Sequence, residues 1–418
     1  MRTFFRQTNL ILVLGLFLTF FVSGRVVLAD DEIDLKQALQ EFFSTNFDVL
    51  INKFEIDKAY ADYVTAKLRP NPTFSVNDIG LKTGKGFGAS GDNAQMTFRI
   101  DQLLETGGKR KLRSSVASTT VEAAKLSYQD TIRSLLIGFY TNFFNMTLDL
   151  ANIEAAKDDL TRFDRVLDIA NKRFKAGDLS SVDIMKLEVS RIDLENTVTN
   201  AENQFKNDAE QFAMLIGREK AIKPVKIGEI KDVPIASEDV LLERAYQNRY
   251  DLLALQKQAK VAEKGKVLAK VMGRPDVSVG AERDTFGPDH SLGIGLGFSV
   301  ALPLYNRNQG DRLRKKAELE QIVLQIEKTK RQIVLDIRQN LNNFQATSKV
   351  FDAYKKRKSD MEDLMARSEK AFTYGAMTVL DLLNTQKTFR DFKVKYNQAF
   401  VQCGLNRELI QVYTGEIK

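Results

Sequence analysis

The feature of this sequence that most constrains its fold is an internal duplication. Segment 173–217 aligns without a gap on segment 371–415, and a second block that includes Pro72 and Pro275 repeats at nearly the same separation. The matched positions of the first block are Phe174/Phe372, Gly177/Gly375, Asp183/Asp381 and Gly217/Gly415. A unit of roughly 200 residues is far longer than solenoid repeats of about 20–50 residues. Two such units therefore predict one pseudo-symmetric body and not a stacked array.

The first 29 residues have the pattern of a secretory signal peptide. Arg2 and Arg6 precede an apolar run from Leu10 to Phe21, and small residues up to Ala29 offer a cleavage site. This run is shorter than the about 20 residues that a spanning helix needs, and no later segment is long and apolar enough to be one. We therefore expect an exported chain that enters a membrane, if at all, only as strands.

The repeat and the leader together predict four segments. We expect the signal peptide at 1–29, a first structural repeat at 30–217, an inter-repeat linker at 218–239 and a second structural repeat at 240–418. Removal of the leader takes away three arginines and leaves 59 basic against 55 acidic residues. An excess this small, spread over so long a chain, argues against nucleic acid as a partner.

Helical periodicity dominates both repeats. Segments 34–68 and 240–272 each show apolar residues at helical spacing and stop before a proline. Segments 111–174 and 313–372 are much longer and predict rods of about 95 Å at 1.5 Å per residue, which implies coiled-coil packing. A shorter helix returns after each rod with an apolar seam. Cys403, the only cysteine, lies in this seam where the first repeat has a phenylalanine, so we expect a small buried hydrophobe.

After the first helix of each repeat the apolar period changes from 3.6 to 2. We expect one hairpin at about 73–104 and another at about 276–302, with strands of about ten residues that are apolar on one face, as in membrane β-strands. The alternative is a sheet edge on a soluble helical protein, but the sequence predicts no other strands to cover the apolar face. Four strands cannot close a barrel, and an open edge is unstable in lipid. Several chains would therefore share one barrel.

Three local motifs resemble one family. The segment 371–384, AFTYGAMTVLDLLN, is similar to the helical turn at the periplasmic tip of TolC-type outer-membrane efflux channels of Gram-negative bacteria. The segments 102–110, QLLETGGKR, and 302–310, LPLYNRNQG, resemble the strand-to-helix junctions of the heavy-metal (cobalt–zinc–cadmium) branch of that family. Together with the repeated order of helix, hairpin, long helix and returning helix, the resemblance covers essentially the whole mature chain.

The resemblance implies a mainly α fold with membrane β-strands. It implies a homotrimer whose twelve strands form one β-barrel in outer-membrane lipid, continued by a helical barrel across the periplasm. It also implies two further partners, a periplasmic adaptor protein and an inner-membrane pump of the RND type. The function implied is a passive conduit for efflux to the cell exterior, with divalent metal cations as a candidate cargo. The alternative function is an exported soluble helical scaffold without a pore.

The resemblance places a pore gate near the start of the last helix. Asp381 matches one acidic gate position of the family, whereas Asn384 falls where many relatives carry a second acid. Three copies of Asp381 around an axis would favour cations. Asp183 is the repeat mate of Asp381 and the third candidate. For both aspartates the alternative role is local, because a carboxylate is favourable at a helix N-terminus.

The turns at the ends of the rods are the candidate docking surface for the adaptor. Gly177 and Gly375 would permit tight reversals at positive φ. The residues that we expect to present this surface also include Phe174, Phe372 and Thr378. A plain helical-hairpin turn would need the same glycines, so the turns by themselves do not establish docking.

The sequence contains no pattern typical of an enzyme, a metal site or a cofactor site. His290 is the single histidine, and we expect it in an exposed strand loop. One histidine without a cluster of other ligands predicts no transition-metal site. The Gly293-x-Gly295-x-Gly297 motif lies inside a predicted strand with no helix opening after it, which excludes a dinucleotide loop. We therefore expect no catalytic residues and no cofactor.

Overall fold

The computed structural model describes residues 32–79, 95–225, 235–286 and 291–416. The predicted signal peptide, the glycine-rich loop at 84–91 and His290 lie outside the described residues. In the first repeat the elements are α1 (Leu35–Thr45), α2 (Phe47–Lys67), β2 (Thr73–Ile79), β3 (Gln95–Leu104), α3 (Lys109–Lys175) and α4 (Ser181–Leu215). In the second they are α5 (Glu238–Asn248), α6 (Tyr250–Met272), β5 (Val277–Phe286), β6 (Ser291–Val300), α7 (Gln309–Thr373) and α8 (Val379–Thr414). The repeated order confirms the duplicated, mainly helical fold.

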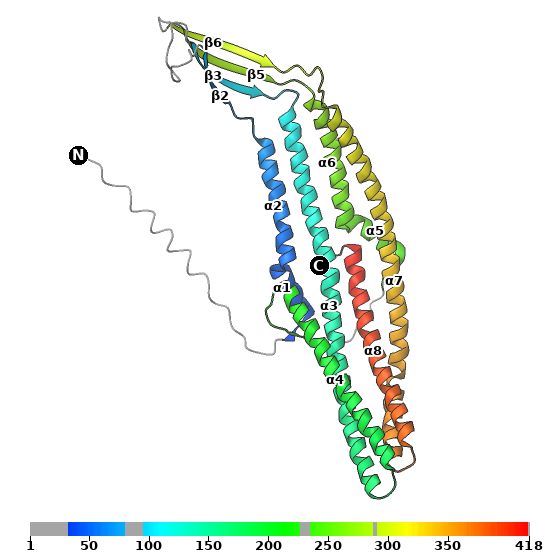
Figure 1. Cartoon of the computed structure of the whole chain (residues 1–418). Helices are drawn as coiled ribbons and strands as arrows, with labels where there is room; N and C mark the ends of the chain where they lie inside the picture. Colours follow the sequence, from blue (N-terminus) through cyan, green and yellow to red (C-terminus); the bar gives the residue numbers. More distant parts are fainter. Residues whose placement is uncertain (1–31, 80–94, 226–234, 287–290, 417–418) are drawn as a thin grey trace, which may run out of the picture.

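The molecule is elongated, with its sheet and its helical tips at opposite ends (Figure 1). The four-stranded sheet lies at one end, and the long pairs α3–α4 and α7–α8 extend to the other. The α3 helix has 67 residues and α7 has 65, close to the predicted rods. None of the described helices contains a stretch that is both long and apolar enough to cross a bilayer.

The prediction of one continuous helix over 34–68 was wrong. The helix breaks at Asn46, whose backbone is extended at ψ 122°. Its side chain accepts a hydrogen bond from the Val49 amide (2.9 Å) and donates one to the Leu215 carbonyl (2.7 Å). Asn46 therefore caps α2 and ties it to the end of α4. The sequence gives no sign of this break because the capping partner is 169 residues away.

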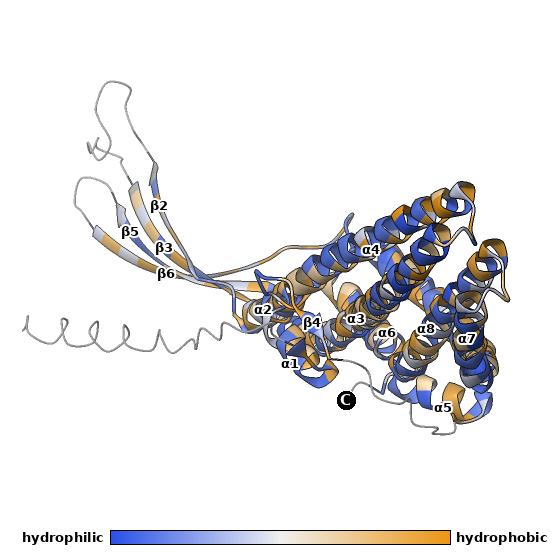
Figure 2. Ribbon diagram, turned by 90° about the horizontal axis from the view of Figure 1, so that it is seen from below, coloured by the Kyte–Doolittle hydropathy of each residue, from blue (hydrophilic) through white to orange (hydrophobic). Residues whose placement is uncertain are grey.

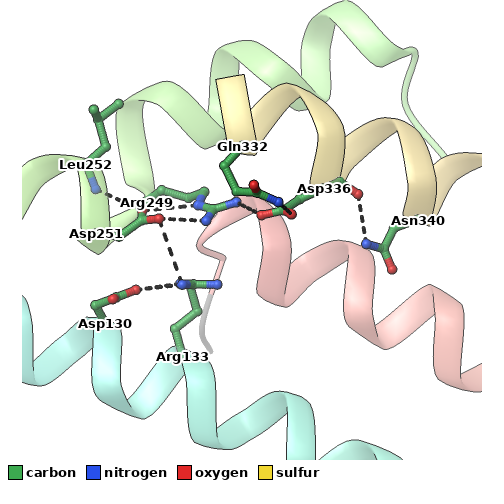
Figure 3. Close-up of polar contacts among 8 residues, drawn as sticks. All are labelled: Asp130, Arg133, Arg249, Asp251, Leu252, Gln332, Asp336 and Asn340. Carbon is green, nitrogen blue, oxygen red and sulfur yellow. Dashed lines mark hydrogen bonds and ion pairs between the residues drawn. The ribbon is translucent and has the colours of Figure 1, made fainter. Parts of the chain in front are cut away.

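The matching helix over 240–272 also breaks, at Arg249, which is only 2% exposed. The Arg249 guanidinium bonds Asp251 on α6 (2.6 Å) and Asp336 on α7 (2.6 Å), as Figure 3 shows. The Arg133 guanidinium on α3 lies 3.9 Å from the Asp251 carboxylate. Burial alone would raise the pKa of Asp251, but the hydrogen bond and charge of Arg249 outweigh it and lower this pKa. The cluster therefore joins three helices from both repeats.

A second correction concerns strands outside the two hairpins. Residues Glu32–Ile33 (β1) pair in parallel with Lys223–Pro224 (β4), a contact that the sequence does not predict. Ile33 is 1% exposed and packs into a core cluster with phenylalanines from α1, α3 and α4. These residues are Phe42, Phe139, Phe143 and Phe212. The short pairing thus fastens the start of the described chain beside the linker.

The main sheet has the order β2-β3-β5-β6, with every neighbouring pair antiparallel. The register aligns Ile100 with Ala281 and Ala281 with Leu296, so apolar side chains of all four strands share one face. Figure 2 shows their alternation with polar residues along the strands. The face is bare in the single chain, because Ile294 is 87% and Leu296 is 88% exposed. Arg283 is the cation on this face, toward the loop end of β5.

The opposite face of the sheet is polar. Arg99 on β3 binds Asp101 (2.7 Å) and Glu282 on β5 (2.8 Å). A Cβ added at Gly295 would lie 2.8 Å from the Glu282 carboxylate, and one at Gly297 would lie 3.2 Å from the Arg99 guanidinium. The alternating glycines of β6 therefore make room for ionic side chains from the neighbouring strands. This is the structural reason for the glycine motif.

Candidate functional site

Both helical hairpins end in turns of the same geometry. Gly177 follows α3 with φ +88°, and Gly375 follows α7 with φ +76°. The Asp178 amide donates to the Arg173 carbonyl (2.9 Å), and the Ala376 amide donates to the Ala371 carbonyl (2.8 Å). These are the bonds of a Schellman motif, which places a residue at positive φ and so favours glycine. The sequence prediction of tight reversals at these glycines is confirmed.

The helix that follows each turn is capped in the same way. Ser180 accepts a hydrogen bond from the Asp183 amide (3.2 Å), and Thr378 accepts one from the Asp381 amide (3.1 Å). Each hydroxyl also donates to the carboxylate of its aspartate, at 2.8 Å for Asp183 and 2.6 Å for Asp381. The hydrogen bond from Ser180, aided by the charge of Lys186, lowers the pKa of Asp183. The local role at the helix N-terminus is thus confirmed for both aspartates.

The two tips differ in what their phenylalanines contact. Phe174 is 43% exposed, whereas its repeat mate Phe372 is fully buried. Arg173 crosses from the first hairpin, donates a hydrogen bond to the Phe372 carbonyl (2.8 Å) and covers the Phe372 ring at 5.1 Å from its centroid. Phe372 packs in a core cluster with Phe163, Leu187 and Phe389. Within a single chain, Phe174 is therefore half-exposed at its tip, and Phe372 holds the two tips together.

The exposed face of α8 carries the remaining gate candidates. Asp381 and Asn384 are one turn apart and both exposed, and Asp391 continues the same face two turns further along. The structure therefore brings two of the three sequence-predicted gate residues together. Asp183 lies on α4, in the other hairpin. Asp391 was not a gate candidate in the sequence prediction, although it lies ten residues after Asp381 on the same helix.

Polar ties join α3 to α8 above the tips. The Lys393 ammonium lies 3.5 Å from the Asp159 carboxylate and covers the Phe389 ring at 5.1 Å. The Asn397 amide donates to the Ala151 carbonyl (3.3 Å). Burial raises the pKa of Asp159, while the charge of Lys393 opposes this shift. Together with Arg173, these contacts fasten the second hairpin to the first.

A pair of acids faces across α3 and α4. Burial raises the pKa of Asp149 to about 7. Hydrogen bonding to Asp208 and the negative charge of Asp208 contribute to the same shift. The Asp149 Oδ2 atom is buried and accepts no hydrogen bond among the described residues, while Gln204 donates to Asp208 (3.1 Å). Two carboxyl groups can share a hydrogen bond only if one of them is protonated. Burial and the neighbouring carboxylate thus favour the protonated form of Asp149, a shift that the sequence did not reveal.

The next feature concerns metal ligands in the part of the chain that the structure describes. There, no group of three or more histidine, cysteine or acidic side chains is arranged to hold a metal ion. Cys403 is buried at 4% exposure in the seam of α8, as predicted from the sequence. The side chains that stand out near the tips are thus acids, hydroxyls and aromatic residues rather than a ligand set.

The repeated fold, the bare sheet face and the two joined hairpins define a channel-type architecture. The sequence pattern of the family described as "Outer membrane efflux protein" matches residues 38–218 and 241–406. The chain belongs to the outer membrane efflux protein family.

Individual relatives agree with this assignment. The cobalt-zinc-cadmium resistance protein CzcC of Cupriavidus metallidurans is 23% identical over 380 residues, which cover 87% of this chain and 85% of that protein. The outer membrane protein TolC of Vibrio cholerae is 21% identical over 66% of this chain and 66% of its own length. The crystal structure of CusC superposes with a TM-score of 0.76 at 14% identity and covers 91% of each chain.

Family membership settles the broad function. The protein is an outer-membrane channel component of a tripartite efflux system, with a helical extension in the periplasm. It is a passive conduit and not an enzyme. The scaffold without a pore, the alternative left open by the sequence, is not favoured.

Proposed function

We propose that three copies of this chain form one conduit that exports divalent metal cations from the periplasm, or from an inner-membrane pump, to the cell exterior. The observation that carries the proposal is the bare sheet. Its apolar face is exposed, and β2 and β6 are edge strands of a four-stranded sheet. Unpaired edges are not tolerated in lipid. Three copies would pair β6 of one chain with β2 of the next and close twelve strands.

The helices at the two sides of the chain support the same assembly. The exposed apolar residues of α2 include Phe47, Ile51 and Phe54, which recur at helical spacing on one face, and Leu68 follows directly after the helix. The α7 helix, at the opposite side in Figure 1, has Leu313, Leu324 and Leu335 exposed at intervals of 11 residues, which is one helical face. Exposed apolar side chains that recur on one face of a helix fit an interaction surface. In the trimer α2 of one chain would pack on α7 of the next.

The similarity to the cobalt-zinc-cadmium resistance protein supports metal cations as cargo. The absence of a ligand cluster among the described residues fits a conduit, because a tunnel that binds its cargo tightly releases it slowly. Energy would come from an inner-membrane pump of the RND type. An adaptor would dock at the tips, where Phe174 and Thr378 are exposed beside Gly177 and Gly375.

The gate would lie at the start of α8. Asp381 and Asn384 share an exposed face, and three copies around one axis would place carboxylates near the pore. Opening would require the α7–α8 hairpin to move away from α3. Such a movement would break the contact between Lys393 and Asp159 and the bond from Arg173 to Phe372.

The test of this function uses a deletion strain and the purified protein. The deletion should lower resistance to cobalt, zinc and cadmium more than resistance to drugs, and the intact gene should restore it. The purified protein should run as a trimer in detergent and form ion-conducting pores in planar lipid bilayers. If the protein forms pores but the deletion leaves metal resistance unchanged, metal ions are not the cargo, and the conduit itself still stands. A monomer without conductance would remove the conduit itself.

A further inference from the structure

The junction between the sheet and the helices concentrates positive charge. Four segments meet there: the end of α2 (67–72), the start of α3 (105–113), the end of α6 (266–276) and the start of α7 (303–316). They hold 14 of the 59 lysines and arginines of the mature chain, but only 3 of its 55 acids. The rest of the mature chain is therefore net acidic. We call these four segments the junction belt.

The junction belt has too few acids of its own to pair with its cations, although Lys315 and Lys316 reach Glu318 (2.7 Å) and Glu320 (3.8 Å) just beyond it on α7. Lys109 pairs with Asp276 (2.8 Å) and Arg113 with Glu105 (2.5 Å), which neutralises two of its three acids. The third, Asp311, binds Arg314 (2.7 Å). The remaining cations include one exposed arginine from each segment: Arg69, Arg110, Arg274 and Arg312. None of these four has a carboxylate partner among the described residues.

The junction belt borders the apolar face of the sheet directly. After β6 the chain continues through Leu302 (70% exposed), Leu304 (64%) and Tyr305 (91%), which carry the apolar surface down to the first turn of α7. Tyrosine is typical of the boundary between hydrocarbon and water. The order along the chain is thus apolar strands, an aromatic and aliphatic rim, and then the cations of the junction belt. Figure 1 shows that the strands and the long helices meet at this level.

We infer that the junction belt binds the headgroups of anionic phospholipids in the periplasmic leaflet of the membrane. This inference rests on the proposed embedding of the sheet in lipid. With the strands in hydrocarbon, the four arginines would lie at the depth of the headgroup phosphates on the helical side. Arginine suits this role because its guanidinium binds phosphate oxygens in a bidentate way. The unbalanced charge, repeated in each copy, would collect anionic lipid around the channel and fix its depth.

The test measures lipid preference on the reconstituted protein. Vesicles of phosphatidylcholine that contain the full-length channel receive spin-labelled phosphatidylglycerol or spin-labelled phosphatidylcholine, and electron spin resonance gives the relative association constant of the two. We expect the native channel to favour phosphatidylglycerol roughly threefold to fivefold, since each basic residue near the surface attracts anionic lipid. The preference should fall toward one between about 0.05 and 0.5 M salt.

Variants distinguish the effect of the junction belt on lipid preference from the effect of positive charge elsewhere on the protein. The variant R69Q/R110Q/R274Q/R312Q should lose the preference, and the lysine version of the same four positions should keep most of it. A matched control replaces four exposed lysines of the helical body, Lys206, Lys328, Lys349 and Lys356, by glutamine and should behave as native. Inorganic phosphate should not reduce the preference beyond its effect on ionic strength, because the sites bind membrane headgroups.

Each outcome decides between the two proposals. A native channel that inserts and conducts but shows no preference for phosphatidylglycerol overturns the inference and leaves the conduit standing. A preference that survives in the glutamine variant, or that is insensitive to salt, also overturns it. A native protein that does not enter vesicles of either composition overturns both.

Discussion

At the scale of residues, repeat mates share backbone geometry but differ in surroundings. Asp183 and Asp381 make the same pair of hydrogen bonds with the residues that cap their helices, Ser180 and Thr378. Only the position of α8 in the proposed trimer would give Asp381 a second role at the pore. Equivalent local structure with different surroundings is what a duplicated chain produces when its two copies take different places in one body.

Replacing Asp381 by alanine tests this second role. The change removes three carboxylates from the proposed pore, so the concentration of divalent cation that blocks the conductance should rise on the order of tenfold. The measurement is single-channel current in planar bilayers with added cobalt or zinc. Asp183→Ala removes the same first-turn carboxylate from the other hairpin and is the control. Equal currents and equal block for both variants would leave Asp381 with its local role only.

The acid pair on α3 and α4 predicts a dependence of stability on pH. The folded-state pKa of Asp149 is raised from 3.8 to about 7, so the folded protein binds the proton more tightly than the unfolded chain. Stability from this contact is therefore full below about pH 4 and is lost as pH rises toward 7. The loss should be about 1–2 kcal/mol after discounting for the exposed part of the side chain.

Asp149→Asn should remove this dependence. Asparagine cannot ionise and can still bond to Asp208, so the unfolding midpoint in urea should change less between pH 4 and pH 7.5 than that of the native protein. Asp168→Asn, which replaces an exposed acid on the same helix, should leave the pH dependence intact. A native pH profile in the Asp149 variant would show that the pair does not bind the proton.

At the scale of elements, the turns at the tips are defined by backbone conformation. Gly177 and Gly375 have φ values of +88° and +76°. A Cβ added at Gly177 would meet nothing within 4 Å, so the cost there comes mainly from the positive φ of the backbone. For an L-residue that cost is roughly 1–2 kcal/mol. We expect the long hairpins to stay folded despite this free-energy cost. The substitution should instead change the conformation of the turn at the tip.

The double variant Gly177→Val, Gly375→Val should therefore abolish efflux while trimers still reach the outer membrane. The measurement combines metal resistance with membrane fractionation. Gly138→Ala is the matched control, since Gly138 is helical and its added Cβ also meets nothing within 4 Å. It should be neutral or stabilising by about 0.5–1 kcal/mol. Normal efflux through the valine variant would exclude docking at these turns.

At the scale of the whole molecule, the exposed faces of α2 and α7 predict which helices of neighbouring chains contact each other. Phe54 lies 13 residues before the end of α2, and Leu324 lies 15 residues after the start of α7. At 1.5 Å per residue both are about 20 Å below the sheet. Cysteines at these two positions should form a disulfide between neighbouring chains when the protein is oxidised in membranes.

The cross-link is read on a denaturing gel. Phe54→Cys with Leu324→Cys should give a covalent trimer, and either cysteine alone should give mainly monomer. Cys403 is buried and serves as an internal control for non-specific oxidation. A ladder beyond the trimer would indicate open association, and monomer in the double variant would exclude packing of α2 on α7.

Local signals in the sequence predicted most of the elements correctly. The change of period from 3.6 to 2 identified the hairpins, and the glycines at the ends of the rods identified the tips, because both depend on backbone geometry over a few residues. The breaks at Asn46 and Arg249 were missed for the opposite reason. Asn46 bonds Leu215, and Arg249 bonds Asp336, so their partners are far along the chain.

The sequence by itself determined a twice-repeated unit, its helical and strand periods and the need for several chains around one sheet. These follow from the repeat, from side-chain periodicity and from the rule that backbone groups must be paired in lipid. Only the tertiary structure decided that Phe372 is buried while Phe174 is exposed, that Asp149 faces Asp208, and that unpaired arginines gather below the strands. Such facts depend on which distant segments pack together, and no local pattern in a sequence carries that information.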